Sequence, residues 1–266
     1  MSQAWMIVSG KGGVGKSTIT SGLGMALASR SMQCCCMDAD HGLRSLDMLF
    51  NMHNKVVYDA LDVARKDCKL KYALINHNLH EGLSLLPAAQ LGDVKDMDDG
   101  DVTRIIKKIK KRVPYVLIDA PAGIGEGIEN LLPSIDHSIL VTTADDIAIR
   151  DGEQVISMLE KAGKGRPMLI VNRVIPEMVA EGEMYSPQTV AEVLDVPLLG
   201  FIPEDRSVIA AVNRHESFME RECPAHAAID RIAQRFLGEY IPMPEITAKR
   251  RGFFGWRRKK SVSINL

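Results

Sequence analysis

The stretch that decides the fold of this 266-residue chain is Gly10-Lys11-Gly12-Gly13-Val14-Gly15-Lys16-Ser17-Thr18. It fits the pattern G-x-x-x-x-G-K-[ST], in which glycines let successive backbone N–H groups turn toward phosphate oxygens. Residues 5–8 before it are an apolar run typical of a buried strand, and residues 19–28 after it favour a helix. A chance glycine-rich turn would lack these flanks. The stretch therefore predicts a phosphate-binding loop, in which Lys16 reaches the β- and γ-phosphates and Ser17 binds Mg²⁺.

The composition limits what the chain can be. Hydrophobic residues make up 46% and charged residues 25%, which is enough apolar material for one large domain with a substantial core. The formal net charge is −1, so no overall field favours nucleic acid. No run approaches the roughly 18 apolar residues of a membrane-spanning helix, and the first expected strand leaves no room for a signal peptide. We expect a cytoplasmic protein.

The five cysteines form no C-x-x-C pair; they are Cys34, Cys35, Cys36, Cys68 and Cys223. Adjacent residues of a strand point to alternate faces, so the three consecutive cysteines cannot converge on one metal ion. We expect them to be small buried side chains. The seven histidines show no ligand spacing on a helix. We therefore expect no metal site built from cysteine or histidine.

Apolar runs alternate with helical stretches, which predicts βαβ units and an α/β fold. We expect a doubly wound, mostly parallel sheet with helices on both faces. The expected strands cover residues 5–9, 33–38, 83–87, 115–119, 138–142, 167–172 and 198–202. The expected helices cover about 16–30, 101–112, 146–162, 187–194, 205–213 and 223–237. Within 101–112, apolar residues recur at three- and four-residue spacing between lysines, so this helix should present a solvated basic face.

Two groups of aspartates should lie beside the phosphate loop. Asp119 follows the apolar run 115–118, and ligands collect at the carboxyl ends of parallel strands. A carboxylate at that position can hold the Mg²⁺ shell; the alternative is a simple capping residue. Asp38 and Asp40 fall on one side of an extended segment, so one can face the phosphates while the other supports the loop. Carboxylates beside a nucleotide require a cation between them, which favours Mg²⁺ and an ordered water over a plain Asp-rich turn.

The chain resembles the ParA/MinD class of deviant Walker A ATPases, a SIMIBI branch of the P-loop NTPases. Lys11 inside GKGGVGKST is the signature of the class. Seven further segments are similar to those of its septum-positioning members: 38–47, 58–59, 119–124, 142–143, 150–151, 172–173 and 202–205. The resemblance covers nearly the whole chain, including its C-terminal tail.

The resemblance implies a homodimer that encloses two ATP molecules. Lys11 would reach across to the partner's phosphates, Lys16 would hold the β- and γ-phosphates, and Asp40 would position the attacking water. Ser17 and Asp119 would hold Mg²⁺. The implied nucleotide contacts come from the loop and from one residue beyond it: Lys11, Gly12, Gly13, Val14, Gly15, Lys16, Ser17, Thr18 at the α-phosphate and Asn172 at the adenine edge. A cation on developing phosphoryl charge can contribute ~10³-fold or more in rate, which supports a catalytic role for Lys11.

The C-terminal tail differs in composition from the rest of the chain. Residues 249–260 carry seven basic side chains, no acidic one, and the aromatics Phe253, Phe254 and Trp256. Aromatics beside basic residues favour an anionic membrane surface; a nucleic-acid patch and a solvated tail are the alternatives. Gly252 and Gly255 disfavour helix in water, so the tail should order on the membrane. One tail should bind weakly, whereas two tails in a dimer can gain ~10²-fold in avidity.

We therefore predict an ATPase domain at 1–238, a linker at 239–248 that leaves the folded body, and an amphipathic membrane-targeting tail at 249–266. The resemblance implies a slow ATPase, stimulated by a partner and by membrane, that selects the division site by recruiting a division inhibitor. It would lie on the inner face of the cell membrane when ATP is bound. The alternatives are a flagellar-number regulator, a DNA-segregating ParA-type ATPase, an iron–sulfur ATPase and a nucleotide-sensing scaffold without turnover. Net charge and the aromatic tail argue against the second, and the lack of bridging cysteines against the third.

Overall fold

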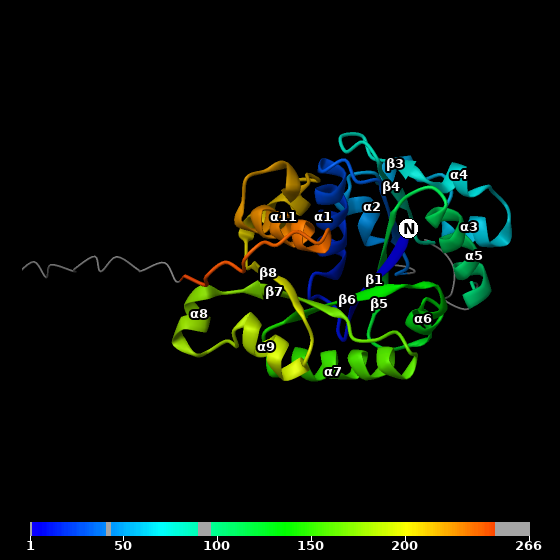
Figure 1. Ribbon diagram of the computed structural model, residues 1–266. Coiled ribbons are helices and arrows are strands. Elements are labelled where there is room, and N and C mark those ends of the chain that lie inside the picture. Colours follow the sequence, from blue (N-terminus) through cyan, green and yellow to red (C-terminus); the bar gives the residue numbers. More distant parts are fainter. Residues whose placement is uncertain (1, 41–43, 90–96, 248–266) are drawn as a thin grey trace, which may run out of the picture.

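The computed structural model describes residues 2–40, 44–89 and 97–247 (Figure 1). One eight-stranded sheet has the order β3-β4-β2-β5-β1-β6-β7-β8. Its strands are β1 (Gln3–Ser9), β2 (Cys34–Asp38), β3 (Ile75–Asn76), β4 (Leu83–Leu86), β5 (Tyr115–Ala122), β6 (His137–Thr143), β7 (Met168–Val174) and β8 (Leu198–Pro203). Every neighbouring pair is parallel except β3 and β4.

Helices cover both faces of the sheet, as Figure 1 shows for α1 and α11 on one side and α7 and α9 on the other. The α-helices are α1 (Lys16–Ser29), α2 (Ser45–Leu49), α3 (Ala60–Arg65), α4 (Leu70–Ala73), α5 (Asp99–Lys110), α6 (Glu126–Glu129), α7 (Asp146–Lys161), α8 (Pro176–Glu181), α9 (Pro187–Leu194), α10 (Arg206–Asn213) and α11 (Pro224–Phe236). Short 3-10 turns are η1 (His53–Lys55), η3 (Leu132–Ser134) and η4 (Phe218–Glu220). The predicted doubly wound α/β fold is confirmed.

Two apolar cores lie on opposite faces of the sheet. Cys35 belongs to the core under α3, α5, α7 and α9, whereas Cys34 and Cys36 belong to the core under α1 and α11. All three cysteines are fully buried, which confirms the prediction from alternation along the strand. In α5 the isoleucines are buried while Lys107 and Lys108 are exposed, so its solvated basic face is confirmed as well.

Each strand and helix expected from the sequence is present with similar ends. Strand β3 and the short helices α2, α3, α4, α6 and α8 were not predicted from the sequence. These elements have two to six residues, too few for hydrophobic periodicity to reveal them. Helix α3 carries a local signal that was overlooked, because Asp59 and Asp62 form a capping box at its start.

The predicted site residues lie together at the carboxyl ends of central strands of the sheet. Strand β1 lies between β5 and β6, and Asp38 at the end of β2 is in register with Asp119 in β5. The loop that follows β1 packs tightly on α7, since a Cβ at Gly10 would lie 2.5 Å from the backbone of Asp151. The phosphate loop and both aspartate groups therefore lie at the carboxyl ends of neighbouring strands, as ligand sites in such sheets do.

The segment after α11 corrects one expectation. Residues 239–247 have no regular secondary structure, but they do not break away from the folded body. Arg235 donates hydrogen bonds to the carbonyls of Ile241 and Pro242, and Ile246 packs against the core. Residues 248–266, which include the predicted membrane-targeting tail, lie outside the described residues. Within the described part of the chain, no helix combines the length and apolarity needed to cross a membrane.

Candidate active site

The phosphate loop has the backbone that its glycines predict. Gly13 and Gly15 have φ angles of +81° and +94°, in the left-handed region that side chains disfavour. Built Cβ atoms at Gly12 and Gly13 would meet nothing within 4 Å, so the loop leaves open space on that side. A Cβ at Gly15 would lie 2.3 Å from Nδ2 of Asn172. Helix α1 begins directly after Gly15, which places its unpaired N–H groups at the loop.

The floor of the loop is a buried polar cluster. Lys16 is 7% exposed, and its Nζ lies 3.3 Å from Oδ1 of the fully buried Asp119. Thr20 donates from Oγ1 to the same carboxylate, at 3.3 Å. The structure therefore brings together Lys16 from the loop and Asp119 from β5, as predicted, and adds Thr20 from α1. No local pattern identifies Thr20 as part of this cluster.

The Asp119 carboxylate fits a divalent cation. Burial raises its pKa, and the neighbouring Lys16 and Ser17 counteract this only in part. Its Oδ2 atom is buried without a hydrogen-bond partner among the described residues. A buried carboxylate oxygen of this kind needs a positive partner, and Mg²⁺ prefers oxygen ligands such as those of Asp119 and Ser17. The residues present thus fit the predicted Mg²⁺ site.

Asp38 and Asp40 have different surroundings, which distinguish the one that supports the loop from the one that faces the phosphates. Asp38 is buried, and its carboxylate accepts hydrogen bonds from the backbone N–H groups of Asp40 and Leu46. The pKa of Asp38 is raised to about 7, mainly by burial and next by the negative charge of the neighbouring Asp119. Asp40 is half-buried and lines a cavity together with Lys16 and Ser17. Asp38 thus supports the loop, while Asp40 faces the phosphate side.

Lys11 lies in different surroundings from Lys16. Its side chain is 34% exposed, and Nζ pairs with Oδ1 of Asp145 at 3.2 Å. Asp145 also caps α7 by accepting from the N–H of Ala148, and it accepts from the Thr143 hydroxyl. Burial alone would raise the pKa of Asp145, but these hydrogen bonds and Lys11 lower it. Asp145 was not predicted from the sequence, although an Asp before a helical run is a recognisable N-cap.

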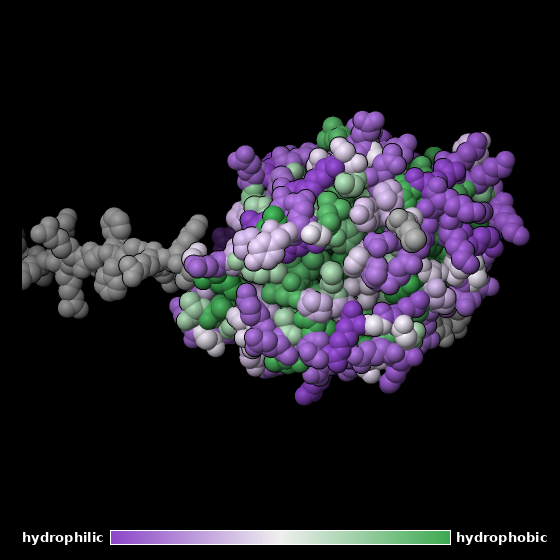
Figure 2. Space-filling model, in the orientation of Figure 1, coloured by the Kyte–Doolittle hydropathy of each residue, from purple (hydrophilic) through white to green (hydrophobic). Residues whose placement is uncertain are grey.

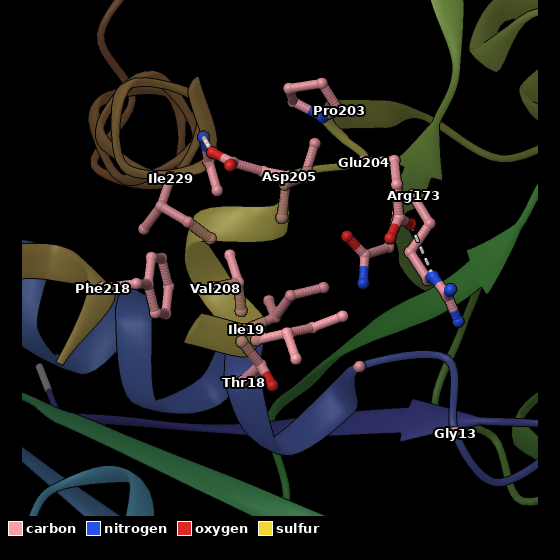
Figure 3. A pocket seen from close by; sticks show the side chains of 15 residues that line it. Gly13, Thr18, Ile19, Arg173, Pro203, Glu204, Asp205, Val208, Phe218 and Ile229 are labelled. Atoms are coloured by element: carbon pink, nitrogen blue, oxygen red, sulfur yellow. Dashed lines mark hydrogen bonds and ion pairs between the residues drawn. The ribbon is translucent and has the colours of Figure 1, made fainter. Parts of the chain in front are cut away.

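A cavity of about 210 Å³ adjoins the loop (Figure 3). Its walls are mainly apolar and come from five segments of the chain: Ile19, Ile202, Val208, Ile209, Phe218, Ala225 and Ile229. Thr18 and Asn172 line the same cavity, and Nδ2 of Asn172 donates to the Val14 carbonyl at 2.7 Å. In Figure 2, the face of the molecule below α11 has an apolar area with hydrophilic residues around it. A flat apolar base fits such a cavity.

Three polar residues, Asp205, Arg173 and Glu204, also line this cavity. Asp205 accepts hydrogen bonds from Ser207 in α10 and Ala225 in α11, so one carboxylate joins two walls. Burial alone would raise its pKa, but these two bonds lower it. Arg173 has a φ of +59° and pairs through Nε with Glu204 at 2.7 Å, as Figure 3 shows. The segments 172–173 and 202–205 were noted in the sequence, whereas nothing local marked Phe218 or Ile229 as wall residues.

The comparison with protein families defines the class. The ParA family model, described as NUBPL iron-transfer P-loop NTPase, matches residues 1–237. The chain therefore belongs to the ParA family of P-loop NTPases, for which ATPase activity and nucleotide binding with Mg²⁺ are the general expectation.

Within that class, the chain is similar to septum site-determining proteins. The septum site-determining protein MinD of Helicobacter pylori is 40% identical over 255 residues, which cover 93% of this chain and 95% of the relative. A MinC:MinD cell division protein complex from Aquifex aeolicus has a TM-score of 0.85 at 34% identity, with 92% of this chain and 99% of that chain covered. MinD from Pyrococcus horikoshii, solved with Mg-ADP, has a TM-score of 0.80 at 28% identity, with 89% and 96% covered.

The chain belongs to the MinD family of septum site-determining cell division proteins. The resemblance stated from the sequence is thereby confirmed. These relatives give no support to the flagellar or DNA-segregation alternatives.

Proposed function

We propose that this chain is a membrane-cycling ATPase that dimerises with ATP and recruits a division inhibitor to the membrane. Membership of the MinD family supports division-site selection, and the Aquifex relative was solved in complex with MinC, which supports an inhibitor as partner. The observation that carries the dimer is the contrast between two lysines of one loop. Lys16 is buried against Asp119 inside the site, whereas Lys11 lies at the rim on Asp145.

The reaction is hydrolysis of ATP to ADP and phosphate. Lys16 would hold the β- and γ-phosphates, and Asp40 would orient the attacking water from the cavity that both residues line. Ser17 and Asp119 would hold Mg²⁺, which neutralises phosphate charge when bound. Lys11 of each protomer would add positive charge on the partner's phosphates, so that the complete site exists only in the dimer.

The free energies of the competing interactions allow Lys11 to leave Asp145 for a phosphate. Both side chains are partly exposed, and an exposed ion pair contributes only about 0–1 kcal/mol. Charge-assisted bonds to a phosphate, in a site closed from water, contribute about 1.5–3 kcal/mol each. ATP in a partner subunit can therefore compete successfully for Lys11.

The tail at 249–266 would attach the dimer to the inner face of the cell membrane. Its basic residues contribute about 1 kcal/mol each near an anionic surface, less the cost of ordering the chain. Two tails held together bind far more tightly than one. Hydrolysis, stimulated by a second protein factor and by membrane, would separate the protomers and return them to the cytoplasm.

Two measurements on the same samples test this proposal. Size-exclusion chromatography with light scattering should give a dimer with ATP and Mg²⁺ for Asp40→Ala, in which turnover is blocked, and a monomer with ADP. Vesicles containing phosphatidylglycerol should sediment the ATP-bound form and leave behind a chain that ends at residue 248. Equal vesicle binding with ATP, with ADP and without the tail would exclude the switch. A monomer under every condition would exclude the shared site.

A further inference from the structure

Helix α11 ends in a reversal of the chain. Gly238 has a φ of +89°, and its N–H donates to the Arg235 carbonyl while that of Glu239 donates to the Gln234 carbonyl. This left-handed glycine stops the helix and turns the chain back along it. The reversed segment, residues 239–247, is called the strap from here on. In Figure 1 it is the orange to red stretch that runs from α11 over β8 toward α8.

One side chain fastens the strap. Arg235 donates from Nε to the Ile241 carbonyl and from Nη2 to the Pro242 carbonyl, each at 2.8 Å. Its Nη1 donates to the Leu199 carbonyl in β8 at 3.1 Å. The planar guanidinium thus bonds the strap and the edge strand of the sheet at once, a geometry that a lysine cannot reproduce.

A glycine in β8, Gly200, leaves room for Arg235 beside that strand. A Cβ at Gly200 would lie 2.5 Å from Cγ1 of Ile232 and 3.2 Å from Nη1 of Arg235, so the glycine lets α11 and its arginine approach β8 closely. Further along the strap, Ile246 packs against the core while its neighbours Glu245 and Thr247 are exposed. The strap is therefore held at both ends, by hydrogen bonds near 241–242 and by apolar contact at 246.

We propose that Arg235 is a positioning residue for membrane attachment: by fastening the strap, it fixes the point on the body from which the basic-aromatic tail departs. This inference rests on the proposed function, because it assigns to the strap the spacing of two tails in one dimer. The chain carries its membrane chemistry only from residue 249 onward, directly after the fastened segment.

The physical reason is the length of the tether. With the strap fastened, five residues separate Thr247 from the first tail aromatic, Phe253. Without the Arg235 bonds, only the half-buried Ile246 contact holds the strap within the described part of the chain. Once that contact is lost, fourteen residues separate Gly238 from Phe253, so the tether is about two to three times as long. Effective concentration falls with about the −3/2 power of tether length, so release should lower that of the second tail ~4-fold.

The experiment uses Arg235→Ala, with Arg235→Lys as a conservative variant and Arg231→Ala as the matched control. Arg231 lies one turn earlier on α11 and makes none of the three bonds to the strap and β8. Each protein is first treated with chymotrypsin, because Tyr240 in the strap is 94% exposed. Cleavage after Tyr240 should be ~10-fold faster in Arg235→Ala than in wild type or Arg231→Ala. Cleavage at the wild-type rate in Arg235→Ala would overturn the fastening role.

Vesicle binding is measured on separate, uncleaved samples with a non-hydrolysable ATP analogue and phosphatidylglycerol vesicles. The protein concentration for half-binding should rise ~4-fold in Arg235→Ala, partly in Arg235→Lys and not in Arg231→Ala, with dimer formation unchanged in all. Insertion of about ten Gly/Ser residues after Thr247 should weaken wild type similarly, and the two changes together should not add fully, since both lengthen one tether. Faster cleavage with unchanged vesicle binding would overturn the membrane role alone. A wild type that never binds vesicles would overturn the proposed function and, with it, that role of the strap.

Discussion

The floor of the phosphate loop is buried and charged, whereas the cavity beside it is lined mainly by apolar side chains. In the floor, Lys16, Asp119 and Thr20 satisfy one another, and Asp119 Oδ2 still has no hydrogen-bond partner within the described residues. In the cavity, apolar residues from separate segments meet, and one carboxylate, Asp205, joins two of the walls.

Under the proposed function, the two regions form two halves of one nucleotide site. Phosphates need backbone N–H groups and a cation, which a short contiguous loop can supply. A base needs shaped apolar surface, which only convergent segments can supply. The two regions touch where Gly15 and Val14 of the loop lie against Asn172 of the cavity.

The largest expected effect comes from Lys16→Ala. The change removes charge-assisted bonds to the phosphates of about 1.5–3 kcal/mol each, so ATP affinity should fall ~100-fold or more by calorimetry. It also leaves Asp119 buried without its cation, so the melting temperature should fall. Lys11→Ala is the matched control in the same loop: it should bind ATP within about threefold of wild type yet fail to dimerise. Tight ATP binding by Lys16→Ala would contradict the assignment of the floor.

Asp119→Asn tests whether Asp119 holds Mg²⁺. The amide keeps the size of the side chain and an oxygen acceptor but removes the charge, so the advantage that Mg²⁺ gives to ATP binding should shrink ~10-fold or more. Removing Mg²⁺ with EDTA should have the same effect on wild type and little further effect on the variant. If Mg²⁺ improves ATP binding equally in both proteins, another residue holds the ion.

Gly15→Ala tests the point where the two regions touch. The methyl group would occupy the position of the Asn172 amide, and alanine at a φ of +94° is strained by about 1–2 kcal/mol. We expect ATP affinity to fall ~10-fold and the melting temperature to drop by several degrees. Gly12→Ala, whose Cβ meets nothing within 4 Å, should keep the wild-type melting temperature. Equal melting temperatures for both alanine variants would mean that the contact with Asn172 is loose.

The smallest effect is expected in the cavity itself. Val208→Ala removes two methyl groups from a half-buried wall, worth about 1 kcal/mol of apolar contact, so ATP affinity should fall ~5-fold. Binding of inorganic tripolyphosphate, which lacks a base, should stay at the wild-type value. Should tripolyphosphate and ATP weaken together, the cavity would not be the base site.

The phosphate loop and its aspartates could be predicted from the sequence to a greater extent than the cavity. The loop, Asp119 and the pair Asp38 and Asp40 were identified because strand ends and glycine spacing are local patterns. Which of the two aspartates supports the loop was decided by the hydrogen bonds from Asp40 and Leu46 to Asp38. Asn172 was named through resemblance, and the structure places it on Val14 at the cavity.

The strap is the clearest case of an expectation that tertiary contacts changed. Two prolines near 242–244 indicate an irregular segment, and the segment is irregular. The segment is attached through the Arg235 guanidinium of α11, which also bonds the Leu199 carbonyl of β8. Both groups lie outside 239–248, so the sequence of that segment could not predict the attachment.

The sequence by itself determined the α/β class, the phosphate loop and the buried cysteine strand, because periodicity and glycine geometry act within a few residues of one another. Only the tertiary structure decided the apolar walls around Phe218 and Ile229, the pairing of Lys11 with Asp145, and the fastening of the strap by Arg235. These contacts join residues from separate elements. Their partners are chosen by how helices and strands pack, and a linear pattern carries no record of that.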